Sequence, residues 1–390
     1  MVNEPLGCEM ESKPVGKKTL FLAGTFDDSG GKPSKIAQAI YDGLGDRKIE
    51  YINGGKFEDI RKYVDNARQY NTVYWFANVP NDKPKLIFDL KKNNPAMILV
   101  SSKRNRRGDD YAFKDLLGRA LKNKSNLLLE FTENENNVLH GRVLDPLGNV
   151  YLDHHPDFKN VGKVLAQRVK QLKGFTRVNS RSVGEAISVP KHGEFFKIVR
   201  KHADTFHDII HTSFDSSGRF LGNASFRADE DSTRCMKGFP SMRAKDGLIF
   251  VSRRNVDKRD IGPESFVAVH PEKLPVHFYG EHKPSVDTPI QVRLYQHYPN
   301  VNFILHSHTY IKGAPFTSEP IPCGALEEVD AIRKVMPKKS ATNFAVNLLG
   351  HGSIVLSENP SFLKDLDFYA RPFPEVHEKY HQCTTSQKRK

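Results

Sequence analysis

The chain contains 390 residues, of which 38% are hydrophobic and 27% are charged, and its formal net charge is +13 at pH 7. This length predicts two domains, each with its own core. The composition excludes an intrinsically disordered chain, and the lack of a long apolar run excludes membrane-spanning helices. The basic excess favours an acidic partner, which could be a phosphorylated small molecule, nucleic acid or an anionic surface.

The N-terminal segment and the cysteines indicate the compartment. Residues 1–17 lack the apolar stretch of a secretory signal peptide. The cysteines are too scattered for a disulfide framework or a thiolate zinc site. They are Cys8, Cys235, Cys323 and Cys383. We therefore expect a cytoplasmic protein in a reducing environment, without membrane contact.

The densest basic cluster consists of Lys103, Arg104, Arg106 and Arg107. No recognisable nucleic-acid-binding motif accompanies it. A solvated basic surface is therefore the favoured interpretation, and a nucleic-acid-binding patch stays open as the alternative.

Residues 18–174 alternate short apolar runs with amphipathic stretches, which is the pattern of a parallel sheet with helices on its faces. The predicted strands are Thr19–Ala23, Ile49–Ile52, Thr72–Ala77, Ala96–Val100 and Asn126–Phe131. The predicted helices are Pro33–Leu44, Phe57–Gln69, Lys83–Lys92 and Tyr111–Lys122. This half is predicted to be a doubly wound α/β domain of the Rossmann or flavodoxin type.

Two further strands, Val138–Val143 and Asn149–Asp153, flank the turn formed by Asp145-Pro146-Leu147-Gly148. This arrangement predicts a hairpin appended to the parallel sheet. A helix over Val161–Leu172 is expected to close the domain.

The loop Gly24–Ser34 leads from the first strand into a helix whose N-terminus could receive a phosphate. It matches neither the Walker A spacing nor the dinucleotide-binding fingerprint. The glycines are therefore expected to serve backbone geometry, and a phosphate site at this strand end is the alternative.

The polar segment 174–190 marks the expected domain boundary. The second domain is predicted to span residues 190–370, and residues 371–390 are predicted to be a C-terminal tail. The second domain opens with a predicted helix over Gly193–His211. It then mixes strands and helices without strict alternation, as an α plus β fold does.

Three histidines of this half are candidate metal ligands. His306 and His308 end an apolar run, and residues two apart on a strand share a face. His351 lies between two apolar runs and is flanked by glycines that allow close approach of a ligand. Three neutral imidazoles leave one coordination position open, as in a catalytic zinc site. A His-x-His pair by itself is more often a pair of ordinary surface or core histidines.

Several motifs around these histidines carry a family resemblance. They are Pro284-Ser285-Val286-Asp287-Thr288-Pro289, a Tyr-Gln-x-x-Pro motif from Tyr295 to Pro299, the His306-Ser307-His308 strand end, Ile321-Pro322-Cys323 and Gly350-His351-Gly352. Their order and spacing resemble the class II aldolase and adducin family. The closest branch is that of ribulose-phosphate 4-epimerases and fuculose-phosphate aldolases. The resemblance covers roughly 180 residues and raises the metal assignment above the ordinary interpretation.

The resemblance implies a reaction and a set of site residues. The metal, Zn²⁺ or another divalent ion, would bind oxygens of a keto sugar phosphate and stabilise an enediolate. Asp287 stands where the family has its acidic residue beside the metal, and it is the expected ligand or general acid/base. A helix N-cap is its alternative role. The expected phosphate-binding residues are Gly222, Asn223, Ser252 and Ser285. Arg253 or Arg254 is the expected cationic partner of the phosphate. An ordinary turn residue is the alternative role of Asn223.

The resemblance also implies a homo-oligomer in which Tyr369 or Tyr380 could donate a proton across subunits. The chain departs from the epimerase branch between His308 and Ile321, where no counterpart of a further acidic catalytic residue is found. We therefore expect a metal-dependent lyase or epimerase acting on a phosphorylated sugar or sugar-nucleotide-like substrate, with carbon–carbon cleavage favoured. The alternatives are a non-catalytic assembly module like adducin and a basic nucleic-acid-associated protein.

Overall fold

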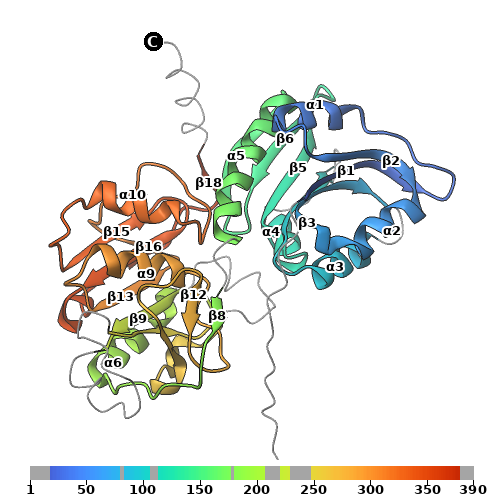
Figure 1. Cartoon of the computed structure of the whole chain (residues 1–390). Coiled ribbons are helices and arrows are strands. Elements are labelled where there is room, and N and C mark those ends of the chain that lie inside the picture. The colour runs from blue at the N-terminus through green and yellow to red at the C-terminus, as the bar shows by residue number, and fades with distance from the viewer. Residues whose placement is uncertain are drawn as a thin grey trace, which may run out of the picture.

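The computed structural model describes residues 18–79, 83–105, 113–176, 180–206, 220–228 and 247–377. Two eight-stranded sheets with helices packed on them make up most of this part of the chain, and Figure 1 shows them as two separate groups of elements. The fold class is α/β, as the sequence predicts. Among the described residues, the helices are too short or too polar to cross a membrane.

The first sheet has the strand order β18-β7-β6-β5-β4-β3-β1-β2. Its parallel strands are β1 (Lys18–Asp27), β2 (Glu50–Lys56), β3 (Tyr70–Asn78), β4 (Ile98–Asn105) and β5 (Leu127–Glu133). The order 2-1-3-4-5 is that of flavodoxin-like doubly wound folds. All five predicted strands are present, and the predicted topology class is confirmed.

Helices cover both faces of this sheet because side chains alternate along each buried strand. Phe21 and Ala23 of β1 pack in one core with α1 (Lys35–Leu44) and α5 (Phe158–Thr176). Leu20 and Leu22 face the opposite core with α2 (Phe57–Asp65) and α3 (Lys83–Asn93), and α4 (Phe113–Lys122) packs over β5 to β7. The four predicted crossover helices therefore lie where the sequence places them, within a few residues at each end.

The predicted hairpin is formed by β6 (Leu139–Leu144) and β7 (Asn149–His155), which pair antiparallel. β6 also runs antiparallel to β5. The turn between β6 and β7 therefore lies at the amino edge of the parallel strands, opposite the carboxyl edge where ligands of such sheets bind.

The loop Gly24–Ser34 is packed against the end of β2. A Cβ atom on Gly24 would lie 2.6 Å from the backbone nitrogen of Gly54, and one on Gly31 would lie 2.0 Å from the carbonyl oxygen of Thr25. The Asn53 side chain accepts a hydrogen bond from the Ser34 N–H at 2.7 Å. These contacts explain the glycines by close backbone packing, which is the favoured interpretation of the loop.

The second sheet is largely antiparallel, with the order β15-β16-β13-β9-β10-β11-β12-β8. Its strands are β8 (Ser180–Ser182), β9 (Asn223–Arg227), β10 (Ile249–Ser252), β11 (Phe266–Val269), β12 (Val276–Phe278), β13 (Phe303–Ser307), β15 (Phe344–Leu348) and β16 (Gly352–Ser357). Helices α9 (Thr288–His297) and α10 (Glu327–Val335) cover one face, and α6 (Gly193–Lys201) covers the other. A short sheet pairs β14 (Tyr310–Ile311) with β17 (Phe368–Tyr369).

The opening helix of the second half is shorter than predicted. It ends at Lys201 and is followed by a 3-10 turn over Ala203–Phe206, and residues 207–211 lie outside the described part.

Of the predicted basic cluster, Arg104 pairs with Glu133 at the end of β4, and Arg106 and Arg107 lie outside the described residues.

The predicted tail begins too early. Residues 371–377 are part of the fold: Arg371, Glu375 and His377 are buried, and β18 (Glu375–Val376) pairs in parallel with β7 of the first sheet. In Figure 1 this strand lies beside α5, between the two groups of elements. The segment is polar and short, so its sequence shows no strand pattern, and only its partners across the fold order it.

Removing this segment is expected to destabilise the protein. A chain that ends at Ala370 loses the Arg371 side chain, which donates to the carbonyl oxygens of Leu147, His308 and Gly350. The Gly350 oxygen keeps its hydrogen bond from Asn149, but those of Leu147 and His308 lose the donor described for them. Each buried acceptor left without a donor costs about 1–3 kcal/mol, so we expect a total loss of at least about 2 kcal/mol.

Denaturant unfolding of this truncation measures the loss, and a chain ending at His377 is the matched control because it keeps every described contact. Equal stability of the two truncations would contradict the structural role of residues 371–377.

Candidate metal centre

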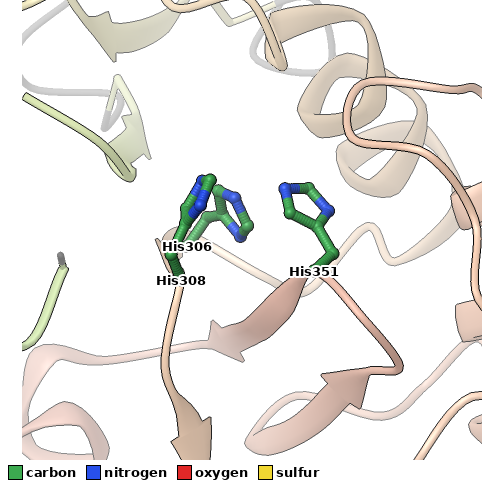
Figure 2. Close-up of side chains that lie close together, drawn as sticks. All are labelled: His306, His308 and His351. Carbon is green, nitrogen blue, oxygen red and sulfur yellow. The ribbon is translucent and has the colours of Figure 1, made fainter. Parts of the chain in front are cut away.

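The three predicted histidines lie together at one end of the second sheet. Nitrogen atoms of His306, His308 and His351, one from each ring, lie within 4.8 Å of one another. The ring centroids are 4.6–5.1 Å apart. Figure 2 shows His306 and His308 at a strand end with His351 opposite them, and the three rings border one space.

Strand pairing produces this convergence. β13 and β16 are antiparallel neighbours in which His306 pairs with Ile354 and Ser307 pairs with Ser353. His306 is on β13, and His308 follows its last residue, while His351 immediately precedes β16. A Cβ atom on Gly352 would lie 2.0 Å from the carbonyl oxygen of Ser307, so glycine is needed for the strands to approach here.

All three imidazoles are buried, with exposed fractions of 3%, 3% and 1%. The His306 Nδ1 atom contacts the Ser353 carbonyl oxygen at 2.9 Å, which leaves Nε2 for coordination. Among the described residues, this buried Nε2 has no hydrogen-bond partner. Burial, followed by the charge of His351, lowers the pKa of His306 to about 4, against the attraction of Asp287 and Glu328. His306 is therefore neutral near pH 7, as a metal ligand must be.

Glu328 is a site residue that the sequence did not reveal. It lies on α10, is 2% exposed, and its Oε1 atom is 2.5 Å from Nδ1 of His351. This contact fixes the ring and leaves Nε2 of His351 for coordination, as carboxylates behind metal-bound histidines do. Burial raises the pKa of Glu328 well above its usual value. Acidic residues are common in the first turn of a surface helix. The sequence around Glu328 therefore gave no indication that this residue supports a metal ligand.

Asp287 lies beside the histidines. Its Oδ2 atom is 3.8 Å from Nε2 of His306 and accepts a hydrogen bond from the Asn223 amide at 3.0 Å. It occupies the N-cap position of α9, but its side chain makes no capping hydrogen bond. The alternative role as a helix cap therefore does not account for the orientation of this carboxylate, which is directed to His306.

The residues predicted to bind phosphate cluster next to Asp287, and several of their polar groups are used within the protein. The Asn223 side chain is fully buried and also accepts a hydrogen bond from Gln291. The Ser252 hydroxyl accepts from the Ala224 N–H at 3.1 Å, and the Ser285 N–H donates to the Ser252 carbonyl oxygen at 3.0 Å.

Gly222 has a positive φ of 66°, and a Cβ atom there would lie 2.4 Å from the Phe206 ring. Close packing therefore explains the glycine at 222, whereas Asn223 contacts the Asp287 carboxylate directly.

Basic side chains border this cluster. Arg253 is half-buried and Arg254 is exposed. Lys258 is only 1% exposed, with its Nζ atom 3.5 Å from the Phe220 carbonyl oxygen. Burial lowers the pKa of Lys258 to about 8, against the attraction of Asp257 and Asp287. Lys258 is a second site candidate missed at the sequence level, because a lysine in a charged loop usually lies in solvent.

Of the two predicted proton donors, Tyr369 lies among the described residues. Tyr369 is 43% exposed on β17, where its ring packs 5.8 Å from that of Tyr310. Tyr380 lies outside the described residues.

Comparison with known proteins identifies this region. A family model described as the class II aldolase and adducin N-terminal domain matches residues 216–361. This region is similar to the class II aldolase and adducin family. The aldolase-type region thus contains Asp287 and all three histidines.

A curated relative is methylthioribulose-1-phosphate dehydratase from Picosynechococcus sp., to which 65 residues are 42% identical. The match covers 17% of this chain and 31% of the relative, so it spans less than a third of that enzyme.

Solved structures show weaker similarity. The N-terminal class II aldolase domain of a conserved protein from Thermoplasma acidophilum aligns with 44% of this chain and 86% of that chain, at 14% identity and a TM-score of 0.29. A DNA/pantothenate metabolism flavoprotein from Streptococcus pneumoniae aligns with 40% of this chain and 99% of that chain, at 10% identity and a TM-score of 0.29.

The donor set of the aldolase-type region fits a divalent metal. Three imidazoles converge, Asp287 lies within reach of the same space, and burial favours the neutral form of His306. Nitrogen donors with one nearby carboxylate suit zinc and its first-row neighbours better than magnesium or calcium.

Replacing Glu328 is expected to weaken metal binding. Glu328→Gln keeps the side-chain shape and an oxygen acceptor but replaces the carboxylate behind His351 with a neutral amide, and such changes reduce metal affinity about 10–100-fold. Competition with a chromophoric chelator measures the affinity. Glu327→Gln, on the adjacent residue of the same helix, is the control. An unchanged affinity in Glu328→Gln would show that metal binding does not depend on a carboxylate behind His351.

Proposed function

We propose that this protein is a metal-dependent lyase of the class II aldolase type that acts on a phosphorylated sugar or a sugar-nucleotide-like substrate. The single observation that carries the proposal is the convergence of His306, His308 and His351 within 4.8 Å in a region of this family. In this proposal the three imidazoles hold Zn²⁺, or another divalent ion, and leave a position open for substrate.

The bound metal would act as a Lewis acid toward oxygen atoms of the substrate. Asp287 would accept or deliver the proton, because its carboxylate borders the space around His306 and is 9% exposed. Asn223 would hold that carboxylate through its amide donor, and Gln291 would in turn orient Asn223.

The phosphate of the substrate would lie against the cluster of Gly222, Asn223, Ser252 and Ser285. The side chains of Asn223 and Ser252 already have protein partners, so backbone N–H groups and a cation would have to supply most contacts. Arg253 or Arg254 would supply the cation at the surface of this cluster.

The proposal also specifies which bond of the substrate breaks. We favour carbon–carbon cleavage over epimerisation because we find no counterpart of the epimerase branch's additional catalytic acid between His308 and Ile321, where Glu319 is the single acidic residue. The curated relative is named a dehydratase of a ribulose phosphate derivative, so loss of water belongs among the reactions to test.

A homo-oligomer is part of the proposal, and the exposed Tyr369 is the residue that we expect to reach a neighbouring subunit.

Metal analysis combined with a substrate panel tests this function. We expect about one zinc or other first-row ion per chain, and retro-aldol or elimination products from at least one sugar phosphate, because three imidazoles form a site with an open position. His306→Ala should lose both the metal and the turnover. His297→Ala, outside the cluster, should keep both.

Metal retained in His306→Ala would overturn the assignment of the centre. A metal-loaded wild type that turns over no sugar phosphate would favour a non-catalytic module like adducin.

Asp287 should affect the chemical step more than metal binding. Asp287→Asn keeps the hydrogen-bonding shape but cannot exchange a proton, so kcat should fall about 10²–10⁴-fold. Substrate turnover by metal-loaded wild type and variant, at matched metal content, is the measurement. A variant that keeps wild-type kcat would remove Asp287 from the proposed chemistry.

A further inference from the structure

The carbonyl oxygen of Gly350, the residue before His351, is held from outside the second sheet. It accepts a hydrogen bond from the Asn149 amide of the first sheet at 2.5 Å, and another from Arg371 Nη1 at 2.7 Å. The N–H of Gly350 donates to the Tyr310 hydroxyl at 2.8 Å. Both polar groups of this one backbone unit therefore have buried partners, and one of these partners lies 201 residues away in sequence.

The Arg371 side chain connects three segments of the chain. Besides Gly350, it donates from Nε to the His308 carbonyl oxygen at 3.1 Å, and from Nη2 to the Leu147 carbonyl oxygen at 2.7 Å. One guanidinium thus contacts the backbone at His308 and directly before His351, and joins both to the β6–β7 turn of the first sheet. Because the guanidinium is planar and rigid, it fixes the relative positions of the oxygen atoms it contacts.

A second set of contacts keeps Arg371 and Asn149 in place. Glu375 accepts from Arg371 at 3.3 Å and from the Tyr310 hydroxyl at 2.6 Å. His377 contacts the Asn149 side-chain oxygen at 3.1 Å. The side chains named here are all 7% exposed or less, so solvent does not compete effectively for these hydrogen bonds.

The fit around Gly350 is tight. Its φ is +77°, and a Cβ atom there would lie 2.6 Å from the Asn149 side-chain oxygen and 2.9 Å from Nε2 of His377. A glycine at this φ is intrinsically free to adopt other conformations, so the position of His351 depends on what holds the residue before it.

We propose that the β6–β7 turn and the segment Arg371–His377 position the metal ligands, so that metal affinity depends on the first sheet. Arg371 and Asn149 are the positioning residues in this arrangement. The proposal rests on the metal centre put forward above and gives a reason for joining the two sheets in one chain. A metal ion demands its ligand nitrogens close to fixed distances, so loss of an anchor on the His351 turn weakens coordination.

The contacts could instead serve only to dock the two sheets. Arg168 separates these explanations. Arg168 is buried and lies on α5, which packs on the first sheet. It donates a hydrogen bond to the Pro320 carbonyl oxygen of the second half at 2.7 Å. In the described hydrogen bonds it contacts neither Gly350 nor His308. Loss of Arg168 therefore weakens docking while the anchor on the His351 turn stays in place.

Zinc affinity and the visible spectrum of the Co²⁺-substituted full-length protein test the proposal. Asn149→Ala and Arg371→Lys should each weaken zinc binding at least about tenfold, with a changed Co²⁺ spectrum, as expected when support behind metal ligands is lost. Arg168→Lys should leave affinity within about threefold of wild type and the spectrum unchanged. Circular dichroism and thermal unfolding identify variants that retain the fold.

If Arg371→Lys does not fold, Asn149→Ala and Tyr310→Phe carry the test, because Tyr310→Phe removes only the hydroxyl that contacts Gly350 and Glu375. Folded anchor variants with wild-type zinc affinity would overturn this inference and leave the proposed function intact. An equal loss in Arg168→Lys would also overturn it, in favour of docking alone. A wild type that binds neither zinc nor Co²⁺ would overturn the proposed function and this inference together.

Discussion

The register of β13 on β16 is the constraint on which the candidate centre depends. Because Ser307 pairs with Ser353, the end of β13 and the start of β16 lie at the same edge of the sheet. His308 and His351 then meet across two adjacent strands, and His306 joins them from within β13. A shift of one residue in this pairing would turn the side chains to the opposite face and separate the rings.

The surroundings of the histidines follow from which face they share. Ile304 of β13 packs in the core that α9 and α10 cover, and His306, two residues later, lies on the same face. The start of α9 supplies Asp287, and the first turn of α10 supplies Glu328. Burial under this cover lowers the pKa of His306 and makes each remaining polar contact stronger than it would be in solvent.

The two sheets are coupled through backbone carbonyl groups. The β6–β7 turn is at the amino edge of the parallel strands, so the first sheet contacts the centre with the edge opposite its expected ligand-binding edge. A substrate at the histidines would therefore lie at least one strand length from that ligand-binding edge. The geometry gives the first sheet a structural part in the centre through Asn149 and the Leu147 carbonyl oxygen.

Local pattern in the sequence determined the parallel strands, their helices and the hairpin, because side-chain periodicity depends on near neighbours along the chain. It also pointed to His306, His308, His351 and Asp287 through motif spacing and a family resemblance. Tertiary structure alone decided that Glu328 supports His351, that Asn223 holds Asp287, and that residues 371–377 return to the first sheet. These contacts join residues 23 to 228 positions apart, and each involves a polar side chain whose own sequence neighbourhood resembles an ordinary surface.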